Sequence, residues 1–250
     1  MLDNETGPWN KLYLEGAEST WTNQLMPEQE IYIRYKGKVW NGLPFKFFNR
    51  LINSKLRKKI WSLRAKFISP KIELDYVEKK ENCIEVNLLD LWWNIGWKTL
   101  LALKYIHSNF EYDYIVRGNA SVYYDLKNLR EFLQLNNPSY CGPIEKNKEF
   151  VSGWSIILSR RAVEILLSNS DQLILQEFDD EAIGGILRKA GIFPEEIPFM
   201  VINSLEAAQN YAERKIPVLR LKYYINTNRR DYELMKIIYE KTFKDYHPIS

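Results

Sequence analysis

Strand-like and helix-like segments alternate along most of this 250-residue chain, and this alternation limits the folds open to it. Apolar residues at helical spacing predict helices at 8–21, 91–106, 126–135, 160–167, 179–190 and 231–243. Runs with β-type composition predict strands or strand-like connectors at 29–35, 72–76, 83–88, 112–116, 140–144, 150–158, 195–202 and 219–225. The pattern indicates an α/β domain with at least some parallel strands. Because such domains normally open on a strand, either a first strand is missing or the strands are ordered differently.

The composition is that of a folded protein with ample material for a core. The chain is 46% hydrophobic and 27% charged, and its length fits one domain or a domain with an appendage. A net charge of +3 is too small to indicate a nucleic-acid-binding protein. Two cysteines, Cys83 and Cys141, and two histidines exclude a Cys/His zinc site. We expect two free thiols in a reducing compartment, with a single disulfide as the alternative.

No targeting or membrane-spanning segment is recognisable. No apolar run reaches the roughly 18 residues that cross a bilayer. Residues 1–7 lack the basic start and apolar core of a signal peptide. We therefore expect a cytoplasmic protein, or a piece cut from a larger one.

A basic segment interrupts the α/β pattern near residue 50. Nine Lys or Arg and no acid lie from Lys46 to Lys71, and apolar residues of 45–67 can share one helical stripe. Either the stripe packs on the core, or the segment lies peripherally on an anionic membrane surface. A membrane or nucleic-acid module carried by residues 45–71 is the weaker alternative for the protein as a whole.

The stretch 112–124 ends a β-type run in Arg117-Gly118-Asn119-Ala120-Ser121. In an open α/β sheet, ligands bind at the carboxyl ends of the strands. Small and polar residues at such an end leave room for a ligand and offer it hydrogen bonds. The alternative is an ordinary strand followed by a polar turn.

Four segments, in order, match the motifs of one enzyme family. The first segment, residues 90–99, is similar to an Asp-x-Tyr-x-Asn-Leu-Thr-x-Lys-Thr signature and reads Asp-Leu-Trp-Trp-Asn-Ile-Gly-Trp-Lys-Thr in this chain. The second segment, residues 114–123, falls on the family's strand that ends in Lys-x-Asp-Asp-Asp-x-Phe. Residues 151–160 look like a Gly-x-x-Tyr-x-x-Ser segment, and 179–184 look like Glu-Asp-Val-x-x-Gly. Over roughly 9–205 the chain thus resembles the β-1,3-glycosyltransferases, the galactosyltransferase and Fringe-like group.

This resemblance implies a GT-A fold, in which a central mixed, mainly parallel sheet is flanked by helices. It implies one domain over 1–250, with a basic helical insertion at about 45–71 and a basic strand-loop-helix at about 217–250. The implied reaction is inverting transfer of a sugar from a UDP-sugar to a hydroxyl of a glycan or lipid-linked acceptor. Inversion needs one general base. By resemblance the base is Asp180, with Asp179 beside it, although acids in a first helical turn also complement the helix dipole.

The chain departs from the family at the metal site. There the family has an acidic triplet that binds a divalent cation, whereas Asn119-Ala120-Ser121 supplies no carboxylate. The protein could be a metal-independent enzyme whose cationic side chains neutralise the leaving diphosphate. It could use a donor or a manganese arrangement that the motif does not reveal, or it could be an inactive relative that only binds sugars or nucleotides. We expect no metal ligands in the motif and no other cofactor.

Further candidates follow from the chemistry of the leaving group, because Arg and Lys hold phosphates by charge-assisted hydrogen bonds. The predicted donor-binding residues are Lys98, Arg117, Asn119, Ser121, Arg220 and Lys222. Each cation could instead be an ordinary surface or structural charge. Trp154, next to Gly153, is the candidate platform for an acceptor sugar ring, with a core aromatic as the equal alternative.

Overall fold

The computed structural model describes residues 9–38, 76–80, 83–89, 94–145, 148–175, 178–211 and 216–243. The basic segment 45–71 therefore lies outside the described residues. Within the described ranges, no helix combines the length and the apolar character that a membrane crossing requires.

Helices and strands alternate along the described chain, as the sequence predicts. The helices are α1 (Trp9–Leu12), the π-helix η1 (Tyr13–Ala17), the 3-10 helix η2 (Trp21–Gln24), α4 (Ile95–Asn109), α5 (Leu126–Asn136), α6 (Arg160–Ser168), α7 (Ser170–Leu175), α8 (Asp179–Lys189), α9 (Leu205–Gln209) and α10 (Asp231–Phe243). The strands are β1 (Arg34–Lys38), β2 (Tyr76–Lys80), β3 (Cys83–Leu89), β4 (Tyr114–Gly118), β5 (Val122–Tyr124), β6 (Tyr140–Gly142), β7 (Ser155–Ser159), β8 (Glu195–Glu196), β9 (Phe199–Ile202), β10 (Val218–Leu221), β11 (Tyr224–Ile225) and β12 (Asn228–Arg229).

The described strands form three mixed sheets and one antiparallel two-stranded sheet. Their orders are β4-β7-β6-β8, β1-β3-β2, β5-β10-β9 and β11-β12. In the largest sheet, β7 is antiparallel to both β4 and β6, and only β8 pairs parallel to β6. The structure is thus mixed α/β, but the expectation of one central, mainly parallel sheet is wrong for the described strands. Buried apolar runs carry no mark of strand direction, so the sequence could not distinguish the two arrangements.

Helix ends show why several predicted boundaries are right. The Ser159 hydroxyl accepts a hydrogen bond from the Ala162 amide at 3.3 Å and caps α6. The Asp125 carboxylate caps α5 in the same way by accepting from the Asn128 amide at 3.1 Å. At the other end of α5, Asn137 adopts the left-handed conformation (φ 44°) that commonly stops a helix.

Several predicted elements are broken or shifted. The strand predicted at 29–35 begins only at Arg34, and the one predicted at 195–202 divides into β8 and β9. The segment 219–225 divides into β10 and β11, because the Tyr223 amide donates to the Asp231 carboxylate at 2.7 Å and leaves the ladder. The short helices α7 and α9 escaped prediction since each is too brief to show a clear period.

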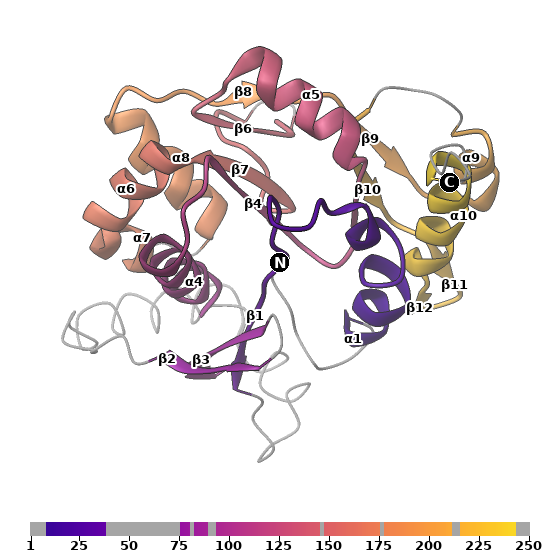
Figure 1. The fold of residues 1–250 in the computed structure, drawn as a ribbon, viewed down its shortest axis with the longest axis horizontal. Coiled ribbons are helices and arrows are strands. Elements are labelled where there is room, and N and C mark those ends of the chain that lie inside the picture. The colour runs from indigo at the N-terminus through magenta and orange to yellow at the C-terminus, as the bar shows by residue number, and fades with distance from the viewer. Residues whose placement is uncertain are drawn as a thin grey trace.

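The core has two main parts on either side of the β4-β7-β6-β8 sheet (Figure 1). Figure 1 shows α4, α6, α7 and α8 gathered beside the β4-β7-β6-β8 sheet, with α1 and α10 on the opposite side near β9 and β10. One apolar cluster joins the N-terminal helices to α10 and the β5-β10-β9 sheet. A second joins α4, α6 and α8 to β6 and β7. The carboxyl end of β4 lies between them, so the predicted strand-end site sits where the two clusters meet.

Candidate functional site

The side chains of the turn after β4 form hydrogen bonds within the turn itself. Asn119 Oδ1 accepts hydrogen bonds from the Ser121 amide at 3.1 Å and from the Ser121 hydroxyl at 2.7 Å. The Val122 amide donates to the Asn119 carbonyl oxygen at 3.2 Å, and Ser121 is buried. The two side chains predicted to contact a donor therefore satisfy each other and hold the turn in a fixed shape.

The loop before β7 joins this turn to the start of α8. The Gly153 amide donates to Asp180 Oδ2 at 2.8 Å, and the Glu181 amide donates to Asp180 Oδ1 at 2.9 Å. The Trp154 carbonyl oxygen accepts from the Asn119 amide at 3.3 Å. The carboxylate predicted as the general base is thus held beside the strand end and is partly exposed to solvent. Among the described residues, no further hydrogen bond reaches either of its oxygens.

Gly153 allows the close approach of Asp180. A methyl group at this position would lie 2.9 Å from Asp180 Oδ2 and 3.1 Å from its Cγ. We expect Gly153→Ala to lower the free energy of unfolding by about 1–3 kcal/mol, because the added carbon overpacks the contact. Chemical denaturation followed by circular dichroism measures this. Gly185→Ala on α8 is the matched control, because open space surrounds that position. Its free energy of unfolding should rise by about 1 kcal/mol, since alanine has the higher helix propensity. Equal losses of stability in both variants would contradict the overpacking at Gly153.

Arg220 on β10 faces Trp154 and a glutamate. Its guanidinium carbon lies 5.1 Å from the Trp154 ring centroid, and its Nη1 lies 3.4 Å from Glu145 Oε1. The same glutamate oxygen accepts from the Ser152 hydroxyl at 2.9 Å. Burial lowers the pKa of Arg220, while Glu145 opposes that effect, and the side chain stays cationic. Its buried Nε has no hydrogen-bond partner among the described residues and remains an unused donor.

Glu145 is a site residue that the sequence did not indicate. A hydrogen bond from Lys148 lowers its pKa most strongly, and the Ser152 hydroxyl and Arg220 act in the same direction. The carboxylate is therefore ionised near neutral pH and fixes the orientation of Arg220. A lone glutamate in a polar loop matches no spacing pattern, so only the fold could reveal this role.

The Trp154 side chain is buried in the core rather than exposed to a ligand. The side chain is only 4% exposed, and its ring meets Phe199 edge-on with centroids 5.6 Å apart. This geometry corresponds to the core-aromatic alternative, and it leaves Arg220 as the group that covers the indole face.

Arg117 and Asp179 form a buried ion pair. Arg117 Nη2 lies 2.5 Å from Asp179 Oδ2, and both side chains are almost fully enclosed. Arg117 Nε donates to the Tyr35 hydroxyl at 3.1 Å, and the Thr99 hydroxyl donates to Asp179 Oδ2 at 2.9 Å. Burial acts to lower the pKa of Arg117, but Asp179 and Tyr35 outweigh it and the pKa is raised. We call these four residues the ion-pair network.

The ion-pair network gives Arg117 and Asp179 contacts that differ from those predicted for them. Asp179 was expected beside the base and Arg117 at the donor, yet each has its charge neutralised by the other inside the protein. Their described contacts therefore give them a structural role, holding the start of α8 against β4. Asp180, one residue further, is the carboxylate left facing the loop at Gly153.

Lys98 and Lys222 take no part in the contacts described above. Lys98 is 2% exposed on α4, and Lys222 is exposed just beyond the end of β10, where its amide donates to the Ile202 carbonyl oxygen. The residues that the structure does bring together come from four segments far apart in sequence. These residues, which we call the strand-end site, are Asn119, Ser121, Glu145, Gly153, Trp154, Asp180 and Arg220.

Neither the search for metal ligands nor the sequence comparisons identify a function for the strand-end site. Among the residues that the structure describes, no three or more His, Cys, Asp or Glu side chains are grouped to hold a metal ion. No protein-family model matches the chain, and no curated protein sequence is significantly similar to it.

Proposed function

We propose that this protein is a glycosyltransferase that transfers a sugar, with inversion, from a nucleotide-diphosphate sugar to an acceptor hydroxyl. The observation that carries the proposal is the clustering of the strand-end site. Three of the four segments that resemble glycosyltransferase motifs contribute to it: Asn119 and Ser121, Gly153 and Trp154, and Asp180. An isolated chance match to a motif gives no reason for such segments to meet.

Asp180 is the proposed general base. An inverting reaction requires one carboxylate that removes the proton of the attacking hydroxyl while the bond to the diphosphate breaks. Both oxygens of Asp180 accept backbone N–H bonds, which hold the carboxylate in one orientation beside the strand end. The partial exposure of the side chain leaves room for an acceptor hydroxyl.

Arg220 is the proposed partner of the leaving diphosphate. Its Nε donor is unused, and Glu145 with Trp154 holds the guanidinium in one orientation. A fixed cation at the point where negative charge develops lowers the barrier without any reorganisation during the reaction. This arrangement supports a metal-independent reaction in a chain whose Asn119-Ala120-Ser121 turn has no carboxylate.

Metal independence gives a direct test. We expect transfer activity to be unchanged by EDTA and to fall by about 10²–10³-fold in Arg220→Ala, because a preorganised charge partner of the leaving group is lost. The assay is sugar transfer or donor hydrolysis with a panel of UDP-, GDP- and dTDP-sugars. Lys236→Ala, which removes an exposed cation on α10, should have no effect. Strict dependence on manganese would exclude the Arg220 role, and inactivity of the wild-type chain on the whole panel would refute the proposed enzyme.

A second candidate is a catalytically inactive protein that binds sugars or nucleotides. The observation that favours it is the closed Asn119–Ser121 turn, whose side chains already use each other as partners. Nucleotide binding without turnover in the same panel would support this candidate. For either function, the proposed setting is the cytoplasm with a glycan or lipid-linked partner, and no nucleic acid is expected.

A further inference from the structure

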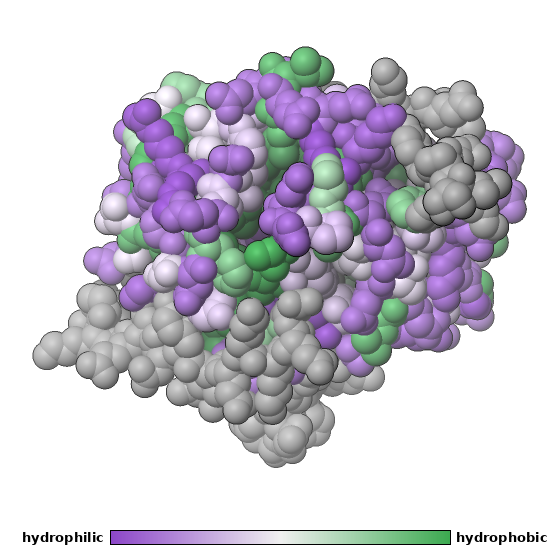
Figure 2. Space-filling view, viewed as in Figure 1, coloured by the Kyte–Doolittle hydropathy of each residue, from purple (hydrophilic) through white to green (hydrophobic). Residues whose placement is uncertain are grey.

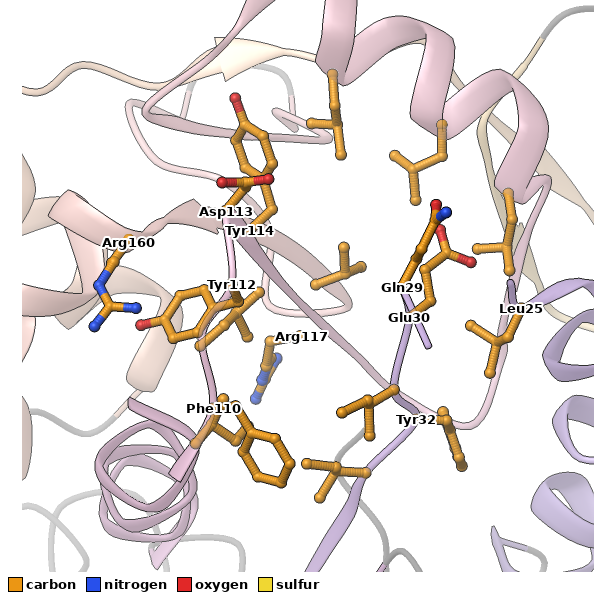
Figure 3. Close-up of a pocket in the computed structure, with 18 of the residues that line it drawn as sticks. Leu25, Gln29, Glu30, Tyr32, Phe110, Tyr112, Asp113, Tyr114, Arg117 and Arg160 are labelled. Atoms are coloured by element: carbon orange, nitrogen blue, oxygen red, sulfur yellow. The ribbon is translucent and has the colours of Figure 1, made fainter. Parts of the chain in front are cut away.

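A large cavity lies beside β4. Its volume is about 1180 Å³, and it separates β4 from the extended chain at 28–33, with α5 along one border. Figure 2 shows this face of the molecule hollowed near its centre, with hydrophobic side chains in the hollow and hydrophilic ones around it. Figure 3 shows Tyr112, Tyr114 and Arg117 on the β4 wall, with Gln29, Glu30 and Tyr32 across from them.

The wall formed by β4 has unused backbone groups. The Arg160 amide donates to the Asp113 carbonyl oxygen, and the Ser159 amide donates away from β4 to the Ser139 carbonyl oxygen. In the antiparallel register with β7, the backbone bonds to β7 are therefore made by Ile115 and by Arg117.

The N–H and C=O groups of Tyr114 and Val116 accordingly point away from β7, in the plane of the sheet, toward the cavity. Among the described residues, no hydrogen bond reaches these four groups. An open row of donors and acceptors on an edge strand is a template for a further strand.

Arg117 supplies a separate, side-chain donor at the same cavity. Its side chain is 4% exposed and lines the cavity wall, and its Nη1 has no hydrogen-bond partner among the described residues. Because Asp179 already neutralises the guanidinium charge, this donor suits an uncharged acceptor such as a peptide carbonyl.

Two further ion pairs border the cavity, while its other charged lining residues, Glu28, Asp113 and Arg161, are exposed to solvent. Glu30 lies 2.6 Å from Arg130, and Glu111 lies 2.6 Å from Arg160. Apolar groups line the space between these pairs, and the Ile31 side chain is 60% exposed there. The apolar lining between the pairs would remove the hydration of a charged occupant, so the interior of the cavity favours an uncharged, partly apolar one.

We propose that an uncharged, extended peptide segment of a partner protein binds in this cavity as a strand added to the free edge of β4. Its backbone would pair with Tyr114 and Val116, and its alternate side chains would enter the apolar lining. A peptide strand fits these observations because it alone offers donors and acceptors at the spacing of β4. This binding is independent of the proposed enzymatic function and is tested without an activity assay.

Amide hydrogen exchange measured by NMR tests the free protein first. The Ile115 and Arg117 amides should be protected, while those of Tyr114 and Val116 exchange rapidly. Equal protection of all four at every protein concentration would mean that the chain's own residues cover the edge. Protection that grows with concentration would mean that a second copy does. Either result would overturn the proposal.

Binding is then measured with a library of acetylated, amidated heptapeptides in which Val, Ile, Leu or Phe alternates with Ser, Thr or Gln. Binders should protect the Tyr114 and Val116 amides, and a matched library with Lys or Glu at the apolar positions should not bind. Ile31→Asp should weaken binding at least about tenfold, since it places a charge in the cavity. Leu135→Asp, at a position that is 84% exposed and outside the cavity lining, should not change it.

Val116→Pro provides a backbone-specific variant, because it removes an N–H that the described structure does not use. It should abolish protection at Tyr114 and weaken peptide binding at least about tenfold. Since Ile31 is exposed, Ile31→Asp keeps the test valid even if the proline variant fails to fold. No binding by any library member, or equal binding by Ile31→Asp and the wild type, would overturn the proposal.

Discussion

Asp180→Asn should lower the rate of sugar transfer by about 10²–10⁴-fold, the usual contribution of a general base. The amide side chain keeps the size of the carboxylate and one acceptor oxygen for the Gly153 or Glu181 amide. It cannot take a proton from the acceptor hydroxyl at neutral pH. Turnover of the accepted donor measures the effect, and calorimetric titration with the corresponding nucleoside diphosphate should show retained binding.

Glu181→Gln is the control for Asp180→Asn. Glu181 is the next acid in the same helical turn, but its side chain is exposed and its amide, not its carboxylate, contacts Asp180. It should retain nearly full activity. Equal losses in both variants would indicate a general electrostatic effect of the acidic helix start, and full activity in Asp180→Asn would remove Asp180 as the base.

Arg117→Met should destabilise the protein by about 3–5 kcal/mol, because Asp179 then remains buried without its charge partner. The substitution also deprives the Tyr35 hydroxyl of a donor. Urea unfolding followed by tryptophan fluorescence measures the loss.

The double variant Arg117→Met with Asp179→Leu tests the cause. Removing both charges should recover much of the stability, since neither group is then left charged and unpaired. Glu111→Gln breaks the surface pair with Arg160, in which Glu111 is 93% exposed, and should cost less than about 1 kcal/mol. A double variant as unstable as the single one would show that packing, rather than the unpaired charge, causes the loss.

Local features of the fold followed from local sequence. The bounds of α10, Asp231–Phe243, coincide with the predicted helix, and α6 begins at Arg160, as predicted, directly after its cap Ser159. Both depend on residues within a few positions of each other, where spacing and capping chemistry act directly.

Partner choice over long distances did not follow from the sequence. Arg117 and Asp179 were each assigned to ligand chemistry, because nothing in a linear pattern shows that two charges 62 residues apart neutralise each other. Strand direction was mistaken for the same reason. The role of Asp180 and Arg220 in catalysis stays a prediction, and their convergence on the strand-end site is what motivates its test.

The ion-pair network also bears on how the chain folds. Its members join β1, α4, β4 and α8, and the hydrogen bonds between them span 62 to 82 residues. Closing loops of that length costs entropy before any bond is gained. The network therefore forms only once these elements have docked. We therefore expect its stabilisation to appear chiefly as a slower rate of unfolding, which prolongs the lifetime of the native state.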